Sequence, residues 1–227
     1  MNAGAMLDAT RRISIDAAPS SSRFKDPSIG YHINEAAKDY ARRTRCLEKT
    51  TTFATVIGQR ESPAPTGFFK ARNVVYDIAS TRRLLLPTVN VNFDVDGSTG
   101  DPDVYAVWGD NFILFPTPNL VRNVQVRLWS LPADLVFSDP MTVGERAIVS
   151  EIPVRYHEDI VAGACALVLS AFEDTTQYTT YAARYERLVA ETEADMRLRF
   201  DGDPLSPFMG DFDFHRHSIP DIDHYDP

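Results

Sequence analysis

The chain has 227 residues, of which 44% are hydrophobic and 24% are charged, so it can bury one good core or one core with a smaller satellite. No run approaches the roughly 20 consecutive apolar residues that a membrane-spanning helix needs, so we expect no membrane association. The net charge of −9 argues against holding a phosphate backbone by general attraction.

The N-terminal part combines a loose start with one helix. Residues 1–25 show little apolar periodicity, and we expect a flexible segment there. Asp26 and Pro27 indicate a helix start, with Asp26 as the N-cap and Pro27 at the first helical position. A β-branched run beginning at Thr50 predicts that this helix ends near Lys49. Its apolar positions are Ile33, Ala36, Ala37, Tyr40, Ala41, Thr44 and Leu47.

Residues 51–154 are expected to form an inserted β domain, since nine of the fifteen prolines and both tryptophans lie there. Short strand-like runs alternate with turn residues, and Gly109–Asp110 between two of them is a hairpin signal. These runs do not alternate with helices, which favours a small antiparallel barrel or sandwich over a doubly wound sheet. The runs are Phe53–Ile57, Val74–Tyr76, Leu84–Leu86, Val91–Val95, Val104–Trp108, Phe112–Phe115 and Val124–Leu128.

Helical periodicity returns after residue 155 in two segments joined by a short link, which predicts an antiparallel helix pair. The first segment has an apolar stripe on one face and small residues, such as Gly163, on the other, which allow a second helix to approach closely. We expect residues 155–200 to pack with residues 26–50 as a helical bundle. The apolar positions of the second segment are Tyr178, Tyr181, Ala182, Tyr185, Leu188, Val189, Thr192 and Met196.

Residues 201–227 are predicted to be an extended acidic arm. They hold seven Asp and one Arg, a net charge of −6, which leaves −3 of the total for the first 200 residues. Four prolines and two glycines prevent a long helix or an inner strand. The segment is nevertheless too apolar for a solubilising tail, so we expect it to become ordered on a partner. Its large apolar residues include Phe208, Phe212, Phe214, Ile219, Ile222 and Tyr225.

The sequence shows no catalytic constellation, so we predict a protein that is not an enzyme and has no cofactor. Cys46 and Cys165 lie in predicted helices and are expected to be buried free thiols in a reducing compartment. No glycine-rich run precedes a Lys-Ser or Lys-Thr pair, as a phosphate-binding loop requires. His157 precedes two acidic residues and could be an acid–base group, but a first helical turn explains the acids through the helix dipole.

Three further patterns have an ordinary structural interpretation. The segment 94–103 resembles a calcium loop in composition, but Gly97 comes too early and no Glu closes the loop. The row Tyr178, Tyr181 and Tyr185 could stack single-stranded bases, yet it continues into aliphatic residues as a core or interface stripe would. Several residues of the arm could bind a metal, but no rigid frame holds them, so we predict no metal site. These are Asp211, Asp213, His215, His217, Asp221, Asp223 and His224.

Three segments together resemble the head–tail connector adaptors of tailed bacteriophages. The first is the helix from Ile33 to Leu47. The second is Gly100–Pro118, in which a G-x-P-x-x-Y segment precedes a strand that ends in Pro-x-Pro, as is common in the β insertion of these adaptors. The third is Ile152–Val161 with Tyr181–Leu188 in the next helix. The likeness covers roughly residues 27–200, and the first 25 residues and the arm have no fixed counterpart.

The resemblance implies a ring of identical subunits, twelvefold by the family's usual symmetry, in the virion neck below the portal. The ring would receive the tail or its nozzle, and DNA would pass through it without sequence-specific binding. Assembly would take place in the host cytoplasm. In related adaptors the C-terminal segment grips the portal or a neighbour, so Phe208, Phe212, Phe214, Ile219, Ile222 and Tyr225 are the predicted portal-binding residues.

The fold class that follows is α+β, with an N- and C-terminal helical bundle, an inserted β barrel or sandwich and an extended arm. Alternatives remain open for function. A soluble β-barrel binding module would have no ring, and a neck or stopper-type virion protein would have no portal contact. A hydrolase with a metal-binding C-terminus would lose activity when His215 and His217 are changed.

Overall fold

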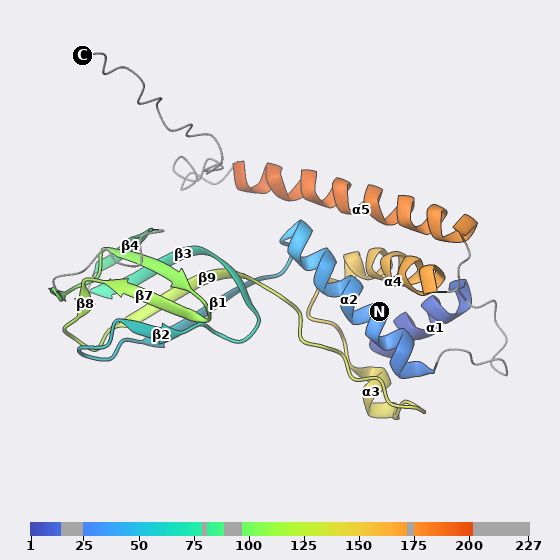
Figure 1. The fold of residues 1–227 in the computed structure, drawn as a ribbon, viewed down its shortest axis with the longest axis horizontal. Helices are drawn as coiled ribbons and strands as arrows, with labels where there is room; N and C mark the ends of the chain where they lie inside the picture. The colour runs from blue at the N-terminus through green and yellow to red at the C-terminus, as the bar shows by residue number, and fades with distance from the viewer. Residues whose placement is uncertain (15–24, 79–80, 89–96, 172–174, 202–227) are drawn as a thin grey trace, which may run out of the picture.

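The computed structural model describes residues 1–14, 25–78, 81–88, 97–171 and 175–201. Within these residues the fold is α+β, as predicted, and it is elongated, with helices at one end and strands at the other (Figure 1). The described helices are α1 (Ala3–Ser14), α2 (Asp26–Thr44), α3 (Val143–Ala147), α4 (His157–Ala171) and α5 (Thr175–Asp201), with a 3₁₀ turn at Val154–Tyr156 before α4.

The strands form one curled sheet of seven strands in the order β1-β9-β3-β4-β6-β7-β2 and a small separate pair, β5 with β8. Their bounds are β1 (Glu48–Ala54), β2 (Glu61–Pro63), β3 (Phe68–Ile78), β4 (Thr81–Pro87), β5 (Thr99–Gly100), β6 (Val104–Trp108), β7 (Asn111–Phe115), β8 (Thr117–Pro118) and β9 (Asn123–Ser130).

The predicted antiparallel barrel or sandwich is confirmed in part. Neighbouring strands of the large sheet are antiparallel except β4 and β6, which run parallel and pair Leu86 with Val104. The connection between these two strands is long, and a parallel pair requires such a crossover. The predicted hairpin is present, since β6 and β7 pair across Gly109–Asp110. The predicted strand Val91–Val95 lies outside the described residues.

The sheet buries a large apolar cluster on one face and a smaller one, made of Ala106, Ile113 and Phe115, on the other. Alternate residues of β3, β4, β6, β7 and β9 point inward, as the period of two in a strand requires. Phe112 is fully buried at the centre, with the ring centroids of Phe68, Phe53 and Tyr105 at 5.1, 6.0 and 6.1 Å. The cluster contains Val74, Tyr76, Leu85, Tyr105, Phe112, Leu114, Val124, Val126 and Leu128.

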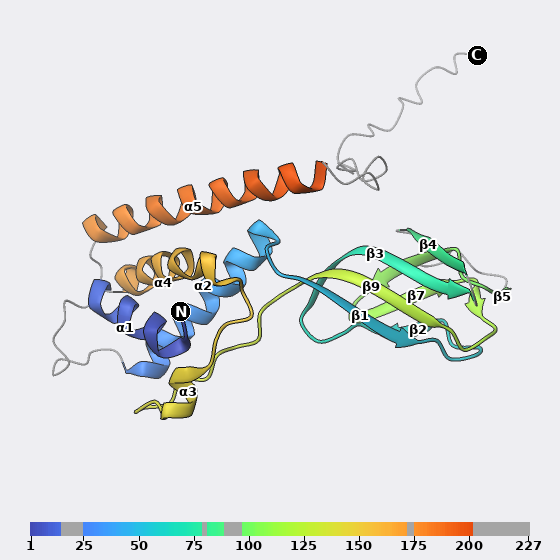
Figure 2. The same ribbon diagram turned by 180° about the vertical axis from the view of Figure 1, so that it is seen from behind.

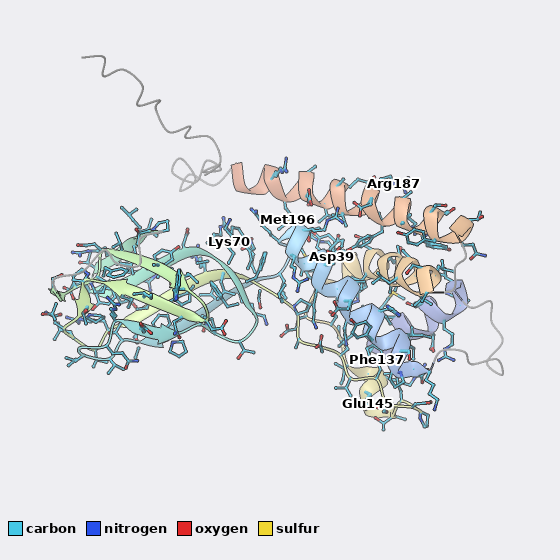
Figure 3. All side chains as sticks on the ribbon, viewed as in Figure 1. Asp39, Lys70, Phe137, Glu145, Arg187 and Met196 are labelled. Atoms are coloured by element: carbon cyan, nitrogen blue, oxygen red, sulfur yellow. The ribbon has the colours of Figure 1, made fainter. Side chains whose placement is uncertain are left out.

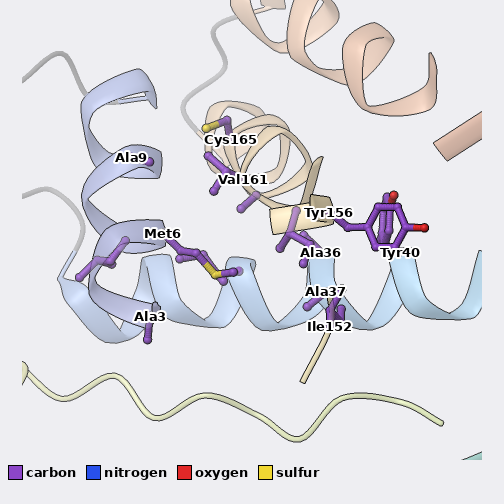
Figure 4. Packing of buried hydrophobic residues seen from close by; sticks show 14 of the residues in the cluster. Ala3, Met6, Ala9, Ala36, Ala37, Tyr40, Ile152, Tyr156, Val161 and Cys165 are labelled. Carbon is purple, nitrogen blue, oxygen red and sulfur yellow. The ribbon is translucent and has the colours of Figure 1, made fainter. Parts of the chain in front are cut away.

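A second core lies among helices from both ends of the chain (Figure 4). Ile33, Ala37 and Tyr40 of α2 share it with Val161 of α4 and Tyr185 of α5. Helices far apart in sequence therefore pack together. The apolar stripe predicted for residues 26–50 is the buried face of α2, and α4 is buried on both its apolar and its small-residue face. The stripe predicted for α5 is buried at Tyr185, Val189 and Met196 but exposed at Tyr178.

The expectation of a flexible start is wrong for residues 3–14. They form α1, which buries Ala3, Met6 and Leu7 in the helical core. The side chain of Arg11 forms an ion pair with Asp26 at the start of α2. The sequence did carry a signal for this helix, because Ala3, Met6, Leu7 and Ile13 recur at helical spacing. Residues 15–24 lie outside the described part of the chain.

The first predicted helix has different ends in the structure. The N-cap of α2 is Lys25, which makes no side-chain capping bond, so Asp26 is the first helical residue. The helix ends at Thr44 because Arg45 adopts a left-handed conformation (φ 55°), and its guanidinium lies 5.1 Å from the Trp129 ring centroid. Cys46 therefore lies beyond the helix, although both cysteines are buried and free as expected.

The segment 131–154 was expected to belong to the β part, but it packs on the helices. The last strand ends at Ser130, and Phe137, Met141 and Ile152 enter the helical core. Phe137 lies directly against Gly30 of α2, where a larger residue would collide with it. Short helix α3 interrupts this segment and begins with a capping box between Thr142 and Glu145.

Candidate interaction surfaces

Helix α5 lies along the outer edge of the helical end (Figures 1 and 2). Its 27 residues extend about 40 Å, since an α-helix rises 1.5 Å per residue. One face is buried against α2 and α4, and most of the remaining surface is exposed. The position of this helix decides where the chain leaves the described body after Asp201. The buried residues of α5 are Tyr185, Val189, Thr192 and Met196.

A buried hydrogen-bond group joins α5 to α2 and α4. The hydroxyl of Tyr40 donates to Asp159 Oδ2 at 2.7 Å and lies 2.8 Å from Thr192 Oγ1. Because Tyr40 uses its proton on Asp159, Thr192 is the donor in the second bond. All three side chains are buried, so each would lose free energy if its partner moved away. Burial raises the pKa of Asp159, although the Tyr40 hydroxyl opposes that shift.

A second set of polar contacts lies at the edge of the same junction. The hydroxyl of Tyr185 donates to Asp39 Oδ2 at 2.8 Å. Arg43 binds Glu186 with two parallel hydrogen bonds of 2.8 and 2.6 Å, which is the bidentate geometry preferred by guanidinium and carboxylate. This contact holds the pKa of Glu186 below its ordinary value. Together the two sets of contacts fix the distance of α5 from α2 and its rotation about its own axis.

Gly163 of α4 explains how closely α5 approaches. A Cβ atom at this position would lie 2.8 Å from Cε2 of Tyr185, which is too short for carbon atoms. The prediction that small residues on this face of α4 admit a second helix is therefore confirmed, with Tyr185 as the residue admitted.

His157 links the start of α4 to the segment before it and to the N-terminus. It is fully buried at the start of α4, with Nε2 2.8 Å from the carbonyl oxygen of Ile152, and its Nδ1 lies 2.9 Å from the Met1 amine. Burial lowers the pKa of His157, which favours the neutral ring. The first-turn interpretation is confirmed for the helix start. It is incomplete for Asp159, whose carboxylate points inward to Tyr40 instead of only serving the helix dipole.

The tyrosine row of α5 faces mainly the helices. Tyr185 is buried, Tyr181 is half-buried against the helical core, and only Tyr178 is largely exposed. The interpretation of the row as a core stripe is confirmed for Tyr181 and Tyr185. Arg187 and Glu191, one turn apart on the outer face of α5, form an ion pair with 3.6 Å between Nε and Oε1.

Figure 3 labels Arg187 and Met196 on α5, Asp39 on α2, and Phe137 and Glu145 in the segment between the last strand and α4. Among the described residues there is no group of three His, Cys, Asp or Glu side chains that could hold a metal ion, and no helix there could cross a membrane. Asp94 and Asp96 lie outside these residues, as do the possible ligands of the arm. The same holds for the predicted portal-binding residues Phe208, Phe212, Phe214, Ile219, Ile222 and Tyr225.

Sequence reasoning missed the polar group around Tyr40, because Tyr40 is more than a hundred residues away from both Asp159 and Thr192. It also missed α3, for which the Thr142-x-x-Glu145 spacing was a usable helix-start signal.

Comparison with known protein families gives a match over residues 1–206 to a family model described as SU10 adaptor protein. Every helix and strand in the described part of the chain lies inside the matched range. None of the curated proteins compared with the chain matches it.

Proposed function

We propose that this chain, which belongs to the SU10 adaptor protein family of phage head–tail adaptors, is a structural virion protein that joins the head to the tail. The resemblance to connector adaptors indicated by the sequence motifs is confirmed by this family match. The match is the observation that carries the proposal. The fold is consistent with it, since helices from both ends of the chain form a fixed body from which α5 and a set of strands extend.

The finer proposal is a homo-oligomeric ring, twelvefold, below the portal in the virion neck. Such a ring would surround the DNA path without sequence-specific contact, and the net charge of −9 supports passage of DNA over adhesion to it. Subunits would be made and assembled in the host cytoplasm, with the tail or a nozzle protein on the other side of the ring.

The arm is proposed to be the portal-binding element. It follows α5 directly, and α5 is held by the buried contacts of Tyr40 and Tyr185, so the point where the arm starts is fixed. The aromatic and aliphatic residues of the arm would enter pockets in the portal or add to a sheet edge, and its aspartates would meet basic rims. These anchors are Phe208, Phe212, Phe214, Ile219, Ile222 and Tyr225.

Truncation of the arm tests this proposal. A chain lacking residues 204–227 should melt at the temperature of the full chain but no longer bind purified portal rings in a pull-down or in negative-stain images. A second variant keeps the arm's length and charge and replaces Phe212 and Phe214 with serine. If the aromatic residues are the anchors, this variant should lose most portal binding although the arm is still present.

Undiminished binding by the truncated chain would reject the arm as the portal contact. A chain that stays monomeric with portal and never forms rings would instead support a neck or stopper-type protein without portal contact, or a binding module. Native mass spectrometry of the mixture separates these outcomes.

A further inference from the structure

Two loops at one end of the sheet, residues 55–59 and 119–122, form an exposed apolar surface that we call the distal tip. Loops at strand ends are usually built from Gly, Pro, Asn, Asp and Ser, because those residues favour turns and water. Here each loop instead carries two adjacent branched aliphatic side chains. Their exposed fractions are 55% for Val56, 60% for Ile57, 43% for Leu120 and 61% for Val121.

Hydrogen bonds between the loops hold the distal tip in one shape. The backbone N–H of Thr55 donates to the Arg122 carbonyl at 2.8 Å, and the Arg122 N–H donates back to Thr55 Oγ1 at 2.9 Å. The Thr55 hydroxyl donates to the Leu120 carbonyl at 2.9 Å. The Gly58 N–H donates to the carbonyl of Pro118, the last residue of β8, at 2.9 Å. A surface held in this way loses little conformational freedom on binding.

The distal tip lies at the end of the sheet farthest from the helices (Figure 2). Strand β1 begins just after α2 and ends at Ala54, and β9 begins at Asn123 and returns toward the helices. The tip is therefore separate from α5 and from the start of the arm, to which portal binding is assigned above.

The composition of the distal tip is that of an interface centre. Within 55–59 and 119–122 the one charged side chain is Arg122, which is half-buried, as is Arg60 next to the first loop, and the exposed neighbours Gln59, Asn119 and Asn123 are polar and neutral. An apolar centre with a polar rim is the usual layout of a protein–protein contact. The exposed side chains of the tip are aliphatic or neutral, so the surface fits an apolar groove in a protein better than a nucleic acid, whose binding takes several exposed cations.

The size of the distal tip decides what kind of partner it fits. Four partly exposed aliphatic side chains present a few hundred Å² at most. A standard interface buries roughly 800 Å² on each partner, so one tip cannot hold a second copy of this chain or a monomeric protein stably. If the subunits form a ring, many tips can contact one partner at the same time, and the combined affinity then far exceeds that of a single tip.

We infer that the distal tip is the contact to a ring-shaped protein on the tail side, with one apolar groove for each adaptor subunit. This inference rests on the adaptor ring proposed above. Each tip would place Ile57 and Val121, its most exposed side chains, in a groove, while the fixed loops keep the spacing that repeated contacts require.

The test places Ile57→Asp and Val121→Asp together in the gene of the phage that carries this protein. Heads should still contain the adaptor by immunoblot, while the fraction of particles with tails in electron micrographs should fall about tenfold or more, because each groove would have to desolvate a charge. Val143→Asp is the matched control. Val143 is 87% exposed on α3 and should tolerate the same change without loss of tails.

Tailed particles at the normal level would overturn the inference. Heads that lack the adaptor would also overturn it, because the tip would then serve the ring or the portal and not the tail. Thermal melting of the purified double variant checks that the fold is kept. Failure of the proposed function has a different signature, namely a natural chain that stays monomeric with portal and forms no ring.

Discussion

The helical end and the strand end of this protein are stabilised by different means. In the helical core, the hydroxyls of Tyr40 and Thr192 and the carboxylate of Asp159 are buried and bonded to one another across three helices. In the strand core, the centre is Phe112 with aromatic rings packed around it. Hydrogen bonds depend on direction, whereas burial of apolar surface does not.

This difference suits two different tasks. A buried polar group permits one arrangement of its partners, so α5 has a defined direction from the body. The sheet needs only a stable curled shape, because its role in the inference above is to carry the rigid loops of the distal tip. The helical end would thus orient the arm, and the strand end would hold a docking surface at a distance.

The largest expected effect is loss of the central aromatic residue of the sheet. Phe112→Ala should destabilise the strand region by about 3–5 kcal/mol, since removal of a fully buried ring leaves a cavity. The two cores contain no common residue, so hydrogen exchange measured by mass spectrometry should speed up in β6, β7 and β3 and stay slow in α4.

Trp108→Ala is the control for this variant. Trp108 lies on the neighbouring strand β6 but is largely exposed, so its removal should change stability by less than about 0.5 kcal/mol. If Phe112→Ala accelerates exchange in α4 as much as in the strands, the two ends unfold as one unit and the comparison between them fails.

A middle-sized effect is expected where α4 and α5 approach. Gly163→Ala would press a methyl group on the Tyr185 ring, which cannot easily move because its hydroxyl is bound to Asp39. Gly144→Ala in α3 meets no atom closer than 4.0 Å and serves as the control. The gain in helix propensity largely cancels between the two variants. Gly163→Ala should therefore be less stable than Gly144→Ala by about 1–3 kcal/mol in urea unfolding.

Equal urea midpoints for Gly163→Ala and Gly144→Ala would mean that α5 moves away from the added methyl group without loss of free energy of unfolding. The buried hydrogen bonds would then not fix its direction, and the account of the helical end would be wrong.

The sequence was most informative where structure depends on local pattern. The hairpin at Gly109–Asp110 and the small face around Gly163 could be read because turn preference and helical spacing involve neighbours in the chain. The end of α2 could not be read, because Arg45 takes a left-handed conformation that usually marks glycine, and its contact with Trp129 is distant in sequence. The partner of Asp159 was hidden for the same reason, since Tyr40 lies 119 positions away.

The smallest expected effect concerns the charge of Asp159. Because burial raises its pKa in the folded state, the folded chain retains a proton that the unfolded chain has lost just above pH 3.8, the ordinary value. The contribution of this residue to stability must then fall as pH rises from the ordinary pKa to the raised one. Asp159→Asn keeps an oxygen that accepts from Tyr40 and carries no charge, so it removes this dependence.

Urea unfolding of both proteins between pH 4 and pH 7 measures the difference. Relative to the natural chain, Asp159→Asn should gain stability as the pH rises over this range. Thr192→Val, which removes only the donor to Tyr40, should lose about 1 kcal/mol of stability at every pH, because no titrating group is changed. If the Asp159→Asn difference is independent of pH, burial of the carboxylate does not oppose its ionisation. The helical end would then hold α5 by packing alone, as the strand end holds its own core.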